Sequence, residues 1–219
     1  MRILVINPVG HSTWDESDKN LYTRFLSPST AVDVVSLPRG PRTVESRESY
    51  EEASRLVVEV GVKLVNAYDG VVVNCFLDPG VDELRRRTGR LVIGAGEASL
   101  ALAKLYGRPI YIVTVGSEKD AIDLMWSRVR SLGFEKIVVD IIGTPLGVVD
   151  IDKDREKTLS ILLEATKPIA LRERWVTFVL GCTGFGGYAE RLQGLVGAPV
   201  VDPVKASAIA IESLIRLTK

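Results

Sequence analysis

Short apolar runs rich in β-branched residues recur along the chain, and each is bounded by Gly, Pro, Asn or Asp. Segments in which apolar residues have helical spacing lie between many of these runs. This alternation predicts parallel strands joined by helices. The predicted strands are 3–6, 32–36, 70–74, 91–93, 110–113, 136–141, 176–180 and 199–201.

The longest helical pattern covers 44–67, where polar residues at the start are followed by an apolar stripe through Leu56, Val60 and Leu64. Shorter patterns predict further helices at 84–87, 98–105, 118–132, 153–170, 188–196 and 204–217. Helices and strands therefore alternate through almost the whole chain, which is typical of an α/β fold.

The two halves of the chain repeat one pattern at an offset of 107 or 108 residues. The third strands match most closely, because DGVVVNCFLDPG at 69–80 overlays WVTFVLGCTGFGG at 175–187 and Cys75 falls on Cys182. GRLVIG at 89–94 and GAPVVD at 197–202 form the fourth pair.

The repeat predicts two pseudo-symmetric lobes, each a four-stranded parallel sheet flanked by helices, with the active site between the lobes. We expect residues 1–96 and about 206–219 to form the first lobe and residues 97–205 to form the second. The final helix would then cross back to the first lobe.

The charge balance argues against a nucleic-acid partner, because Lys plus Arg and Asp plus Glu both number 28 and leave no excess of positive charge. The opening MRILVINP has the pattern of a strand and a turn rather than of a signal peptide. No apolar run approaches about 18 residues, so we expect no membrane span. We expect a cytoplasmic homo-oligomer whose partner is a small-molecule substrate.

The only two cysteines follow the third predicted strand of each half, Cys75 after VVVN and Cys182 after FVLG. Ligands of open parallel sheets bind outside the carboxyl ends of the strands. One cysteine alone is equally well explained as a small buried hydrophobe, and the two could pair as a disulfide, although free thiols are expected in a reducing compartment. Their matched positions favour a shared function, with one thiol on each side of a cleft.

Two acid–base groups on opposite sides of one carbon are the minimum for stereochemical inversion by proton transfer. One group removes the α-proton from one face, and the other delivers a proton to the opposite face. The ordinary pKa of a thiol is about 8.5, so one cysteine can be a thiolate while the other is a thiol. Helix N-termini after the cysteines would favour the thiolate and could hold the carbonyl oxygen on which negative charge accumulates.

Seven segments with a distinctive composition are spread over nearly the whole chain. They are INP at 6–8, GPRTVESRESYEEA at 40–53, NCFLDPG at 74–80, VIGAGEAS at 92–99, VTVGS at 113–117, GCTGFGG at 181–187 and VVDPVKASA at 200–208. Together they resemble the aspartate/glutamate/hydantoin racemase superfamily, and within it the hydantoin racemases. The resemblance implies an isomerase that works without pyridoxal phosphate, metal or any other cofactor, with Cys75 and Cys182 as its two bases.

The resemblance also implies a set of substrate-binding positions on loops. They are Asn7, Glu45, Ser46, Phe76, Asp78, Gly116, Ser117, Thr183 and Gly184. Val9-Gly10-His11 departs from the pattern, because hydantoin racemases more often carry Asn and a hydroxyl residue there, and Thr183 is equally similar to the amino-acid racemases. A 5-substituted hydantoin is the first expectation for the substrate, and allantoin, aspartate and glutamate stay open.

Several of these residues also have structural explanations. We expect Asp78 to cap the helix that follows it, and Glu45 and Glu97 to lie at helix starts, where the dipole stabilises a carboxylate. His11 is more simply a surface-loop histidine than a catalytic one. GAGEAS at 94–99 lacks the third glycine of a dinucleotide-binding loop, and two cysteines with one histidine match no zinc spacing, so we expect no metal.

Two other functions fit the same fold. Decarboxylases and maleate isomerases of the superfamily use one cysteine as proton donor or nucleophile, and the presence of two cysteines argues against the single-cysteine decarboxylases. A two-lobed small-molecule-binding protein with inert cysteines is the alternative from another class. Solvent deuterium separates the classes, because a racemase incorporates it into the substrate and a binding protein does not.

Overall fold

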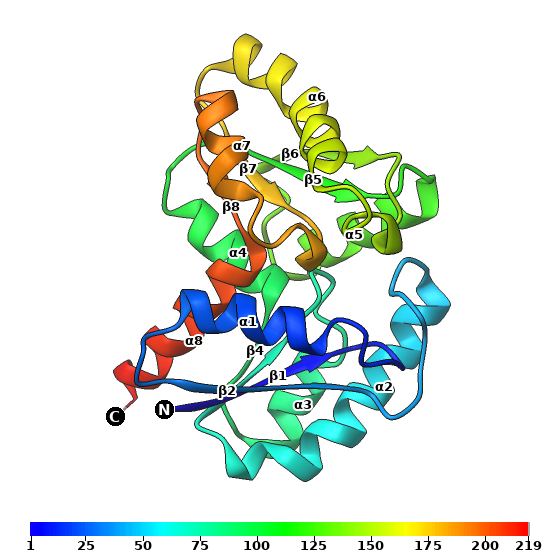
Figure 1. Ribbon diagram of the computed structural model, residues 1–219, viewed down its shortest axis with the longest axis vertical. Coiled ribbons are helices and arrows are strands. Elements are labelled where there is room, and N and C mark those ends of the chain that lie inside the picture. The colour runs from blue at the N-terminus through cyan, green and yellow to red at the C-terminus, as the bar shows by residue number, and fades with distance from the viewer. Residues whose placement is uncertain (219) are drawn as a thin grey trace. The chain divides into compact units, whose positions relative to one another are not determined.

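The computed structural model describes residues 1–218 and divides into two compact units (Figure 1). Unit 1 consists of Met1–Ala98 and the segment from Val204 onward, and unit 2 consists of Ser99–Pro203. All eight predicted strands are present: β1 Arg2–Asn7, β2 Ala31–Ser36, β3 Gly70–Val73, β4 Val92–Gly94, β5 Ile110–Val115, β6 Val138–Thr144, β7 Thr177–Leu180 and β8 Val200–Val201.

The strands form two four-stranded parallel sheets of the same topology. Their orders are β2-β1-β3-β4 in unit 1 and β6-β5-β7-β8 in unit 2. The prediction of an α/β fold with one such sheet in each half is therefore confirmed. The sixth strand begins two residues later than predicted, because the amides of Ile137 and Val138 both donate to the carbonyl of Phe134 and close a turn.

Helices flank both sheets. The α-helices are α1 Asp15–Phe25, α2 Arg47–Leu64, α3 Val81–Thr88, α4 Ala95–Lys104, α5 Lys119–Ser131, α6 Arg155–Glu173, α7 Ala189–Val196 and α8 Pro203–Leu217, and the short 3₁₀ helices are η1 Val65–Ala67, η2 Val148–Asp150 and η3 Thr183–Phe185. The sequence pattern predicted all the α-helices except α1, whose polar sequence DESDKNLYTRF buries only Tyr22.

The start of α2 differs from the prediction by three residues. Ser46 caps the helix, because its Oγ accepts a hydrogen bond from the Ser49 amide at 3.2 Å. In return, the Ser46 amide donates to Oγ of Ser49 at 3.0 Å. Glu45 therefore lies before the cap, and the prediction that it stands at the helix start is wrong.

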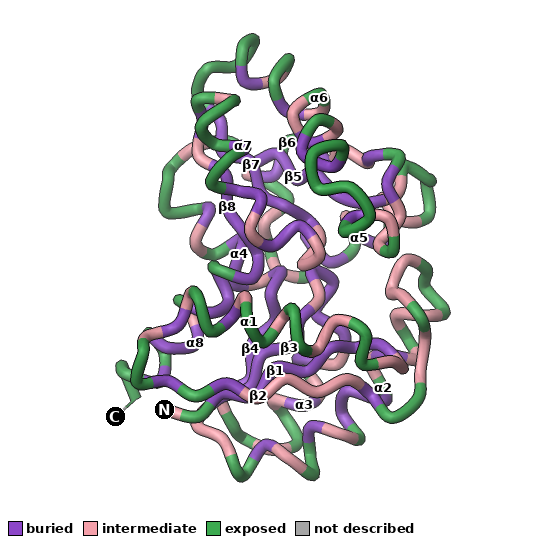
Figure 2. Tube along the Cα trace, in the orientation of Figure 1, coloured by how far each residue is buried: buried purple, intermediate pink, exposed green. Residues whose placement is uncertain are grey.

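The strands β1, β3 and β4 of unit 1 are almost entirely buried (Figure 2), and alternate residues of β1 belong to different apolar cores. Leu4 and Ile6 of β1 face a core that includes Val57 of α2 and Leu84 of α3. Ile3 and Val5 face the opposite core, which contains Tyr22 of α1 together with Val204, Ala208, Ile211 and Ile215 of α8. Because both faces are covered, β1 and β3 are almost continuously apolar, as buried parallel strands are.

In unit 2, the central strands pack with apolar residues of α6 and α7 through Tyr111, Val113, Phe178 and Leu180.

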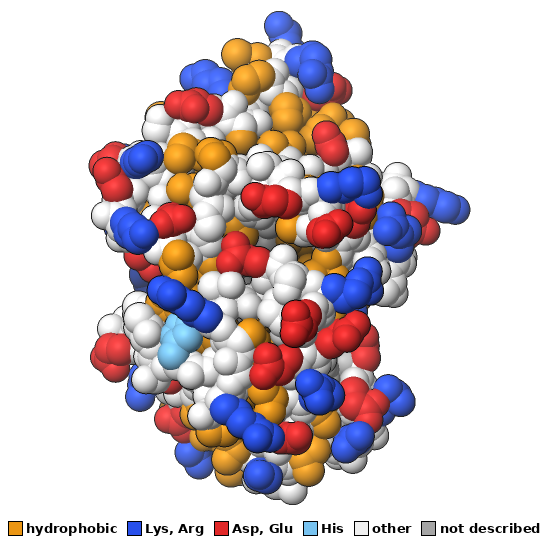
Figure 3. Space-filling view, turned by 90° about the vertical axis from the view of Figure 1, so that its right-hand side faces the viewer, with side chains coloured by type: hydrophobic (Ala, Val, Ile, Leu, Met, Phe, Trp, Pro, Cys, Tyr) orange, Lys and Arg blue, Asp and Glu red, His pale blue; other side chains and the backbone are white. Residues whose placement is uncertain are grey.

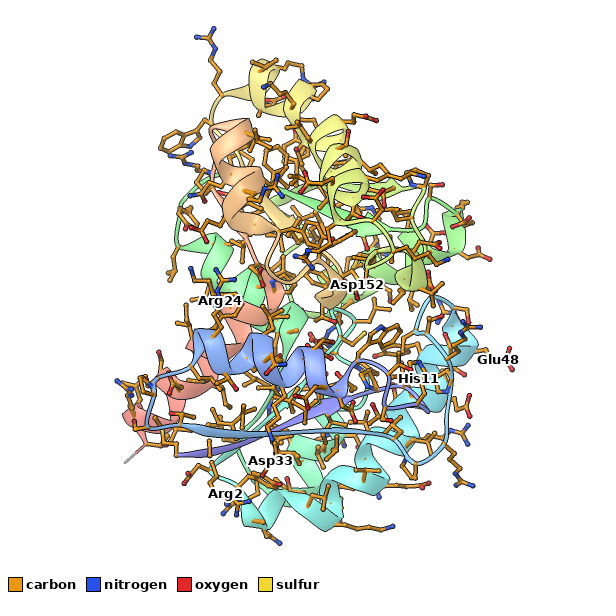
Figure 4. All side chains as sticks on the ribbon, in the orientation of Figure 1. Arg2, His11, Arg24, Asp33, Glu48 and Asp152 are labelled. Atoms are coloured by element: carbon orange, nitrogen blue, oxygen red, sulfur yellow. The ribbon has the colours of Figure 1, made fainter. Side chains whose placement is uncertain are left out.

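Charged side chains lie on the surface. In unit 1, Arg2 of β1 and Asp33 of β2 point toward each other, with 3.1 Å between Nη2 and Oδ2 (Figure 4). Acidic and basic side chains are interspersed on the face shown in Figure 3. Over residues 1–218, no helix has both the length and the apolar character that a membrane crossing requires.

Candidate active site

A buried pair of asparagines joins the carboxyl ends of β1 and β3. Nδ2 of Asn74 donates to Oδ1 of Asn7 at 2.8 Å. Nδ2 of Asn7 donates to the carboxylates of Asp15 and Asp18 of α1, both at 2.9 Å, and Asn74 also donates to Asp18 at 3.1 Å. Both polar atoms of the Asn7 side chain are thus engaged within unit 1, which gives Asn7 a structural role. Its predicted contact with substrate stays a prediction.

The same hydrogen-bond network reaches α8 through Tyr22. The buried phenol of Tyr22 donates to Oδ1 of Asn74 at 3.1 Å and lies 2.9 Å from the hydroxyl of Ser207. The Ser36 hydroxyl at the end of β2 donates to Asp15 at 2.6 Å. The network therefore links the carboxyl ends of β1, β2 and β3 to α1 and α8. It includes Asn74, the residue that precedes Cys75.

Cys75 opens a tight turn at the end of β3. The amide of Asn74 donates to the carbonyl of Ile6 at 2.9 Å, which continues the ladder with β1, and the Asp78 amide donates to the Cys75 carbonyl at 3.1 Å. The side chain of Cys75 has intermediate exposure, whereas the predicted substrate-binding residue Phe76 is 2% exposed. The turn fixes the backbone that carries the thiol.

Asp78 does not cap the helix that follows it, so that prediction is wrong. Gly80 precedes α3 and no side chain caps that helix. Instead, Oδ1 of Asp78 accepts from the Gly96 amide at 2.7 Å and Oδ2 accepts from the Glu97 amide at 2.9 Å, which caps α4. Asp78 is 2% exposed and adopts a left-handed φ of 51°, which a β-carbon-bearing residue rarely adopts. A contact of this carboxylate with substrate stays a prediction.

The GAGEAS segment packs closely against the Cys75 turn. A β-carbon on Gly94 would lie 2.0 Å from Oδ1 of Asp78, and one on Gly96 would lie 1.9 Å from the Phe76 carbonyl oxygen. The glycines are therefore needed for close backbone approach. Glu97 lies in the first turn of α4, as predicted, where it accepts from the Gly94 amide at 3.1 Å and pairs with Arg85.

Cys182 has the matching position in unit 2, at the end of β7 and directly before η3. The Phe185 amide donates to the Cys182 carbonyl at 3.0 Å. Gly184 lies beside the thiol, because a β-carbon added there would stand 3.5 Å from Cys182 Sγ. The hydroxyl of Thr114 on β5 donates to the Gly181 carbonyl at 3.1 Å and ties the two strand ends. Cys182, Thr183 and Gly184 thus form one half-exposed loop.

Gly116 and Ser117 follow β5 in the same unit. Gly116 has a φ of 69° and donates its amide to the Leu146 carbonyl at 2.9 Å. A β-carbon on Gly143 of β6 would lie 2.3 Å from the Gly116 carbonyl oxygen, so β6 packs directly against this turn. Ser117 is exposed at the carboxyl end of the sheet.

Tyr188 supports the loop that contains Cys182. Burial raises the pKa of its phenol, which donates to the Ile151 carbonyl at 3.3 Å. The phenol therefore stays protonated at neutral pH and serves as a hydrogen-bond donor rather than as a base.

His11 lies on the loop after β1. Its Nε2 is 3.0 Å from the carbonyl of Arg42 and its ring contacts Trp14 edge-on, with 4.6 Å between ring centroids. Nδ1 is buried and has no hydrogen-bond partner among residues 1–218. The histidine thus joins the loop after β1 to the segment that leads to Ser46, and its exposure is intermediate.

Asp15, Asp18 and Tyr22 are the residues near the site that the sequence pattern missed. Their spacing of three, four and seven residues places them on one helix face. This helical spacing was the available signal. Because two of the three residues are acidic, they do not form the apolar stripe by which a helix is usually recognised in a sequence. Among residues 1–218, no group of three or more His, Cys, Asp or Glu side chains has an arrangement suited to a metal ion.

Comparisons with known proteins give a consistent result. Residues 3–211 match the family model described as Asp/Glu/Hydantoin racemase. A hydantoin racemase from Paenarthrobacter aurescens is 32% identical over 223 residues, which covers 99% of this chain and 92% of that protein. Allantoin racemase from Klebsiella pneumoniae superposes with a TM-score of 0.89 at 25% identity, covering 100% of this chain and 89% of the other. Allantoin racemase from Pseudomonas fluorescens gives a TM-score of 0.89 at 24% identity, with coverage of 100% and 92%.

Proposed function

Because this chain belongs to the Asp/Glu/hydantoin racemase family and is therefore an isomerase, we propose that it racemises its substrate by proton transfer between Cys75 and Cys182. The observation that supports this proposal most directly is the matched placement of the two cysteines. Each lies two residues after the third strand of its unit, β3 or β7, and the carbonyl of each accepts a hydrogen bond from the amide three residues later.

The reaction needs one thiolate and one thiol. The thiolate removes the proton from the carbon next to a carbonyl, the electron pair of the C–H bond moves toward the carbonyl oxygen, and the thiol on the other face protonates the carbon. The two sulfurs have then exchanged protonation states. Conversion of the opposite enantiomer restores them, so no cofactor is consumed or required.

We further propose that the substrate is uncharged at the reacting centre, with a 5-substituted hydantoin as the first candidate. None of the nine expected binding positions is Lys or Arg, and two of them are Glu45 and Asp78. The carboxylate of a free amino acid would find no basic side chain at these positions while a second negative charge develops beside it. A hydantoin ring acidifies its own C5 proton and needs only neutral hydrogen-bond donors, which Ser117 and Thr183 can supply.

The substrate is tested by following optical rotation and C5–H exchange in D₂O for single enantiomers of 5-substituted hydantoins, allantoin, aspartate and glutamate, against enzyme-free blanks. We expect loss of rotation together with deuterium incorporation for a hydantoin. Activity on aspartate or glutamate alone would contradict the substrate proposal while leaving the reaction type intact.

The mechanism is tested with Cys75→Ala, Cys182→Ala and the corresponding serine variants. Each change removes one of the two bases, so racemisation should fall by about 10²–10⁴-fold, which is the usual contribution of a general acid–base group. The remaining cysteine should still exchange the proton of the enantiomer that faces it, with retention of configuration, and the two variants should select opposite enantiomers. The double variant is the control and should exchange neither. Full racemisation by either single variant would refute the mechanism.

A further inference from the structure

The turns after the two cysteines share two backbone hydrogen bonds. In unit 1 the amides of Asp78 and Val81 donate to the carbonyls of Cys75 and Asp78 at 3.1 and 3.3 Å. In unit 2 the amides of Phe185 and Tyr188 donate to the carbonyls of Cys182 and Phe185 at 3.0 and 3.2 Å. The two units therefore share these two turn hydrogen bonds at equivalent positions.

A glycine with positive φ occupies the same place in both turns. Gly80 has a φ of 76° and Gly187 a φ of 84°. The equivalence of these glycines fixes the alignment of the two turns, and in this alignment Asp78 corresponds to Phe185.

In each unit a buried carboxylate joins the cysteine turn to the end of the fourth strand or the residues after it, and we call this contact the junction. The carboxylate belongs to the turn in unit 1 and to the residue after the fourth strand in unit 2. In unit 1, Asp78 lies in the turn and binds the Gly96 and Glu97 amides that follow β4. In unit 2, Asp202 directly follows β8, and its Oδ2 accepts from the Gly187 amide at 2.6 Å. Asp202 is 5% exposed.

In unit 1 the side chain of Asp78 fills the space that a side chain at the position of Asp202 would need. Gly94 has the position in unit 1 that Asp202 has in unit 2, and a β-carbon on Gly94 would lie 2.0 Å from Oδ1 of Asp78. In unit 2 the position of Asp78 is taken by the fully buried Phe185. Each unit thus has one buried carboxylate that joins its cysteine turn to the end of the fourth strand or the residues after it, although the sequence position differs, which points to a requirement of the junction.

We propose that Asp78 and Asp202 are positioning residues, each of which holds one cysteine turn against the fourth strand of its own sheet. This inference rests on the proposed function, in which both thiols transfer protons. A misplacement of a reacting group by about 1 Å can lower a rate by about 10²-fold. Loss of one carboxylate should therefore slow proton transfer at one cysteine and spare the other.

The experiment measures deuterium exchange separately from each enantiomer of the substrate, after Cys75→Ala and Cys182→Ala have assigned one enantiomer to each cysteine. In Asp78→Asn, exchange from the enantiomer assigned to Cys75 should fall by about tenfold or more, while exchange from the other changes by less than about twofold and proceeds mainly with retention. Asp202→Asn should produce the opposite selectivity.

The chain offers matched controls for the loss of a carboxylate that accepts from a backbone amide. Asp69 accepts from the Arg2 amide at 2.7 Å at the other end of the unit 1 sheet, and Asp154 accepts from the Lys157 amide at 3.0 Å at the start of α6. Asp69→Asn and Asp154→Asn should change both exchange rates equally. This comparison separates positioning from a general loss of stability.

Equal loss from both enantiomers in Asp78→Asn and Asp202→Asn, or no loss from either, would overturn the positioning proposal. If Asp78→Asn does not fold, Asp202→Asn carries the test alone, with Asp202→Glu expected to restore part of the affected rate. If the two cysteine variants fail to select opposite enantiomers, the proposed function itself fails, and this outcome is distinct from a failure of the carboxylate variants.

Discussion

Replacement of Glu212 by glutamine tests how strongly α8 is attached to unit 1. Glu212 is 8% exposed. Its carboxylate accepts from the amide and hydroxyl of Ser27 at 3.2 and 3.0 Å and from the hydroxyl of Thr30. Hydrogen bonds to a charged group contribute about 1.5–3 kcal/mol, and glutamine keeps one acceptor while placing a donor against these donors. We expect Glu212→Gln to lower the free energy of unfolding by about 2–3 kcal/mol at pH 7.

The effect of this substitution should depend on pH. Burial acts to raise the pKa of the Glu212 carboxyl, but the hydrogen bonds from Thr30 and Ser27 and the nearby Arg216 outweigh it and leave the pKa below its ordinary value. A carboxyl with a lowered pKa in the folded state binds its proton more readily when unfolded. Its contribution is complete well above the unfolded pKa of about 4.3 and is lost as the pH falls through the folded pKa.

Urea unfolding followed by circular dichroism, combined with hydrogen exchange of peptides from α8, measures this contribution between pH 7 and pH 3. The difference between wild type and Glu212→Gln should shrink steadily as the pH falls below about 4.3. The matched control is Glu59→Gln, an exposed unit 1 glutamate, which should leave stability unchanged. A Glu212→Gln difference that is constant over this pH range would refute the assignment of the stability to the ionised carboxylate.

Two further substitutions test packing and the buried network. Gly61→Ala places a β-carbon 2.4 Å from Cδ2 of Leu84 between α2 and α3, and the resulting overpacking should cost about 1–3 kcal/mol in urea unfolding; a gain in stability would show that Leu84 moves freely. Tyr22→Phe removes the buried hydroxyl bonded to Asn74 and Ser207, so we expect a loss of about 1–2 kcal/mol and faster exchange of α8 amides. Unchanged α8 exchange would contradict the link through Tyr22.

The strands could be predicted from the sequence because both faces of each sheet are covered, which requires near-continuous apolar runs such as Gly70–Val73. The repeat in the sequence also predicted that Cys75 and Cys182 lie at equivalent strand ends. Helix α1 could not be found in this way. Its inner face carries Asp15 and Asp18, which accept hydrogen bonds from the side chain of Asn7. A search for apolar periodicity does not detect a helix that is attached by polar contacts.

The role of Asp78 could not be predicted because it depends on which helix end lies nearest in space. The usual inference assigns a carboxylate to the next helix along the chain, here α3. The left-handed backbone at Asp78 instead directs its carboxylate to the start of α4, 18 and 19 residues later. The same contact explains why glycine is needed at positions 94 and 96 of GAGEAS. The motif itself does not match a dinucleotide-binding loop.

The attachment of α8 to unit 1 bears on the order in which the chain can fold during synthesis. Val72 of β3 and Ile3 of β1, which share a core with α8, leave the ribosome about 130 and about 200 residues before Val204 does. Until then the nascent first unit exposes the apolar surface against which α8 packs. Unit 2, whose residues are consecutive, can complete its core earlier, so unit 1 becomes fully native after unit 2 although its synthesis begins first.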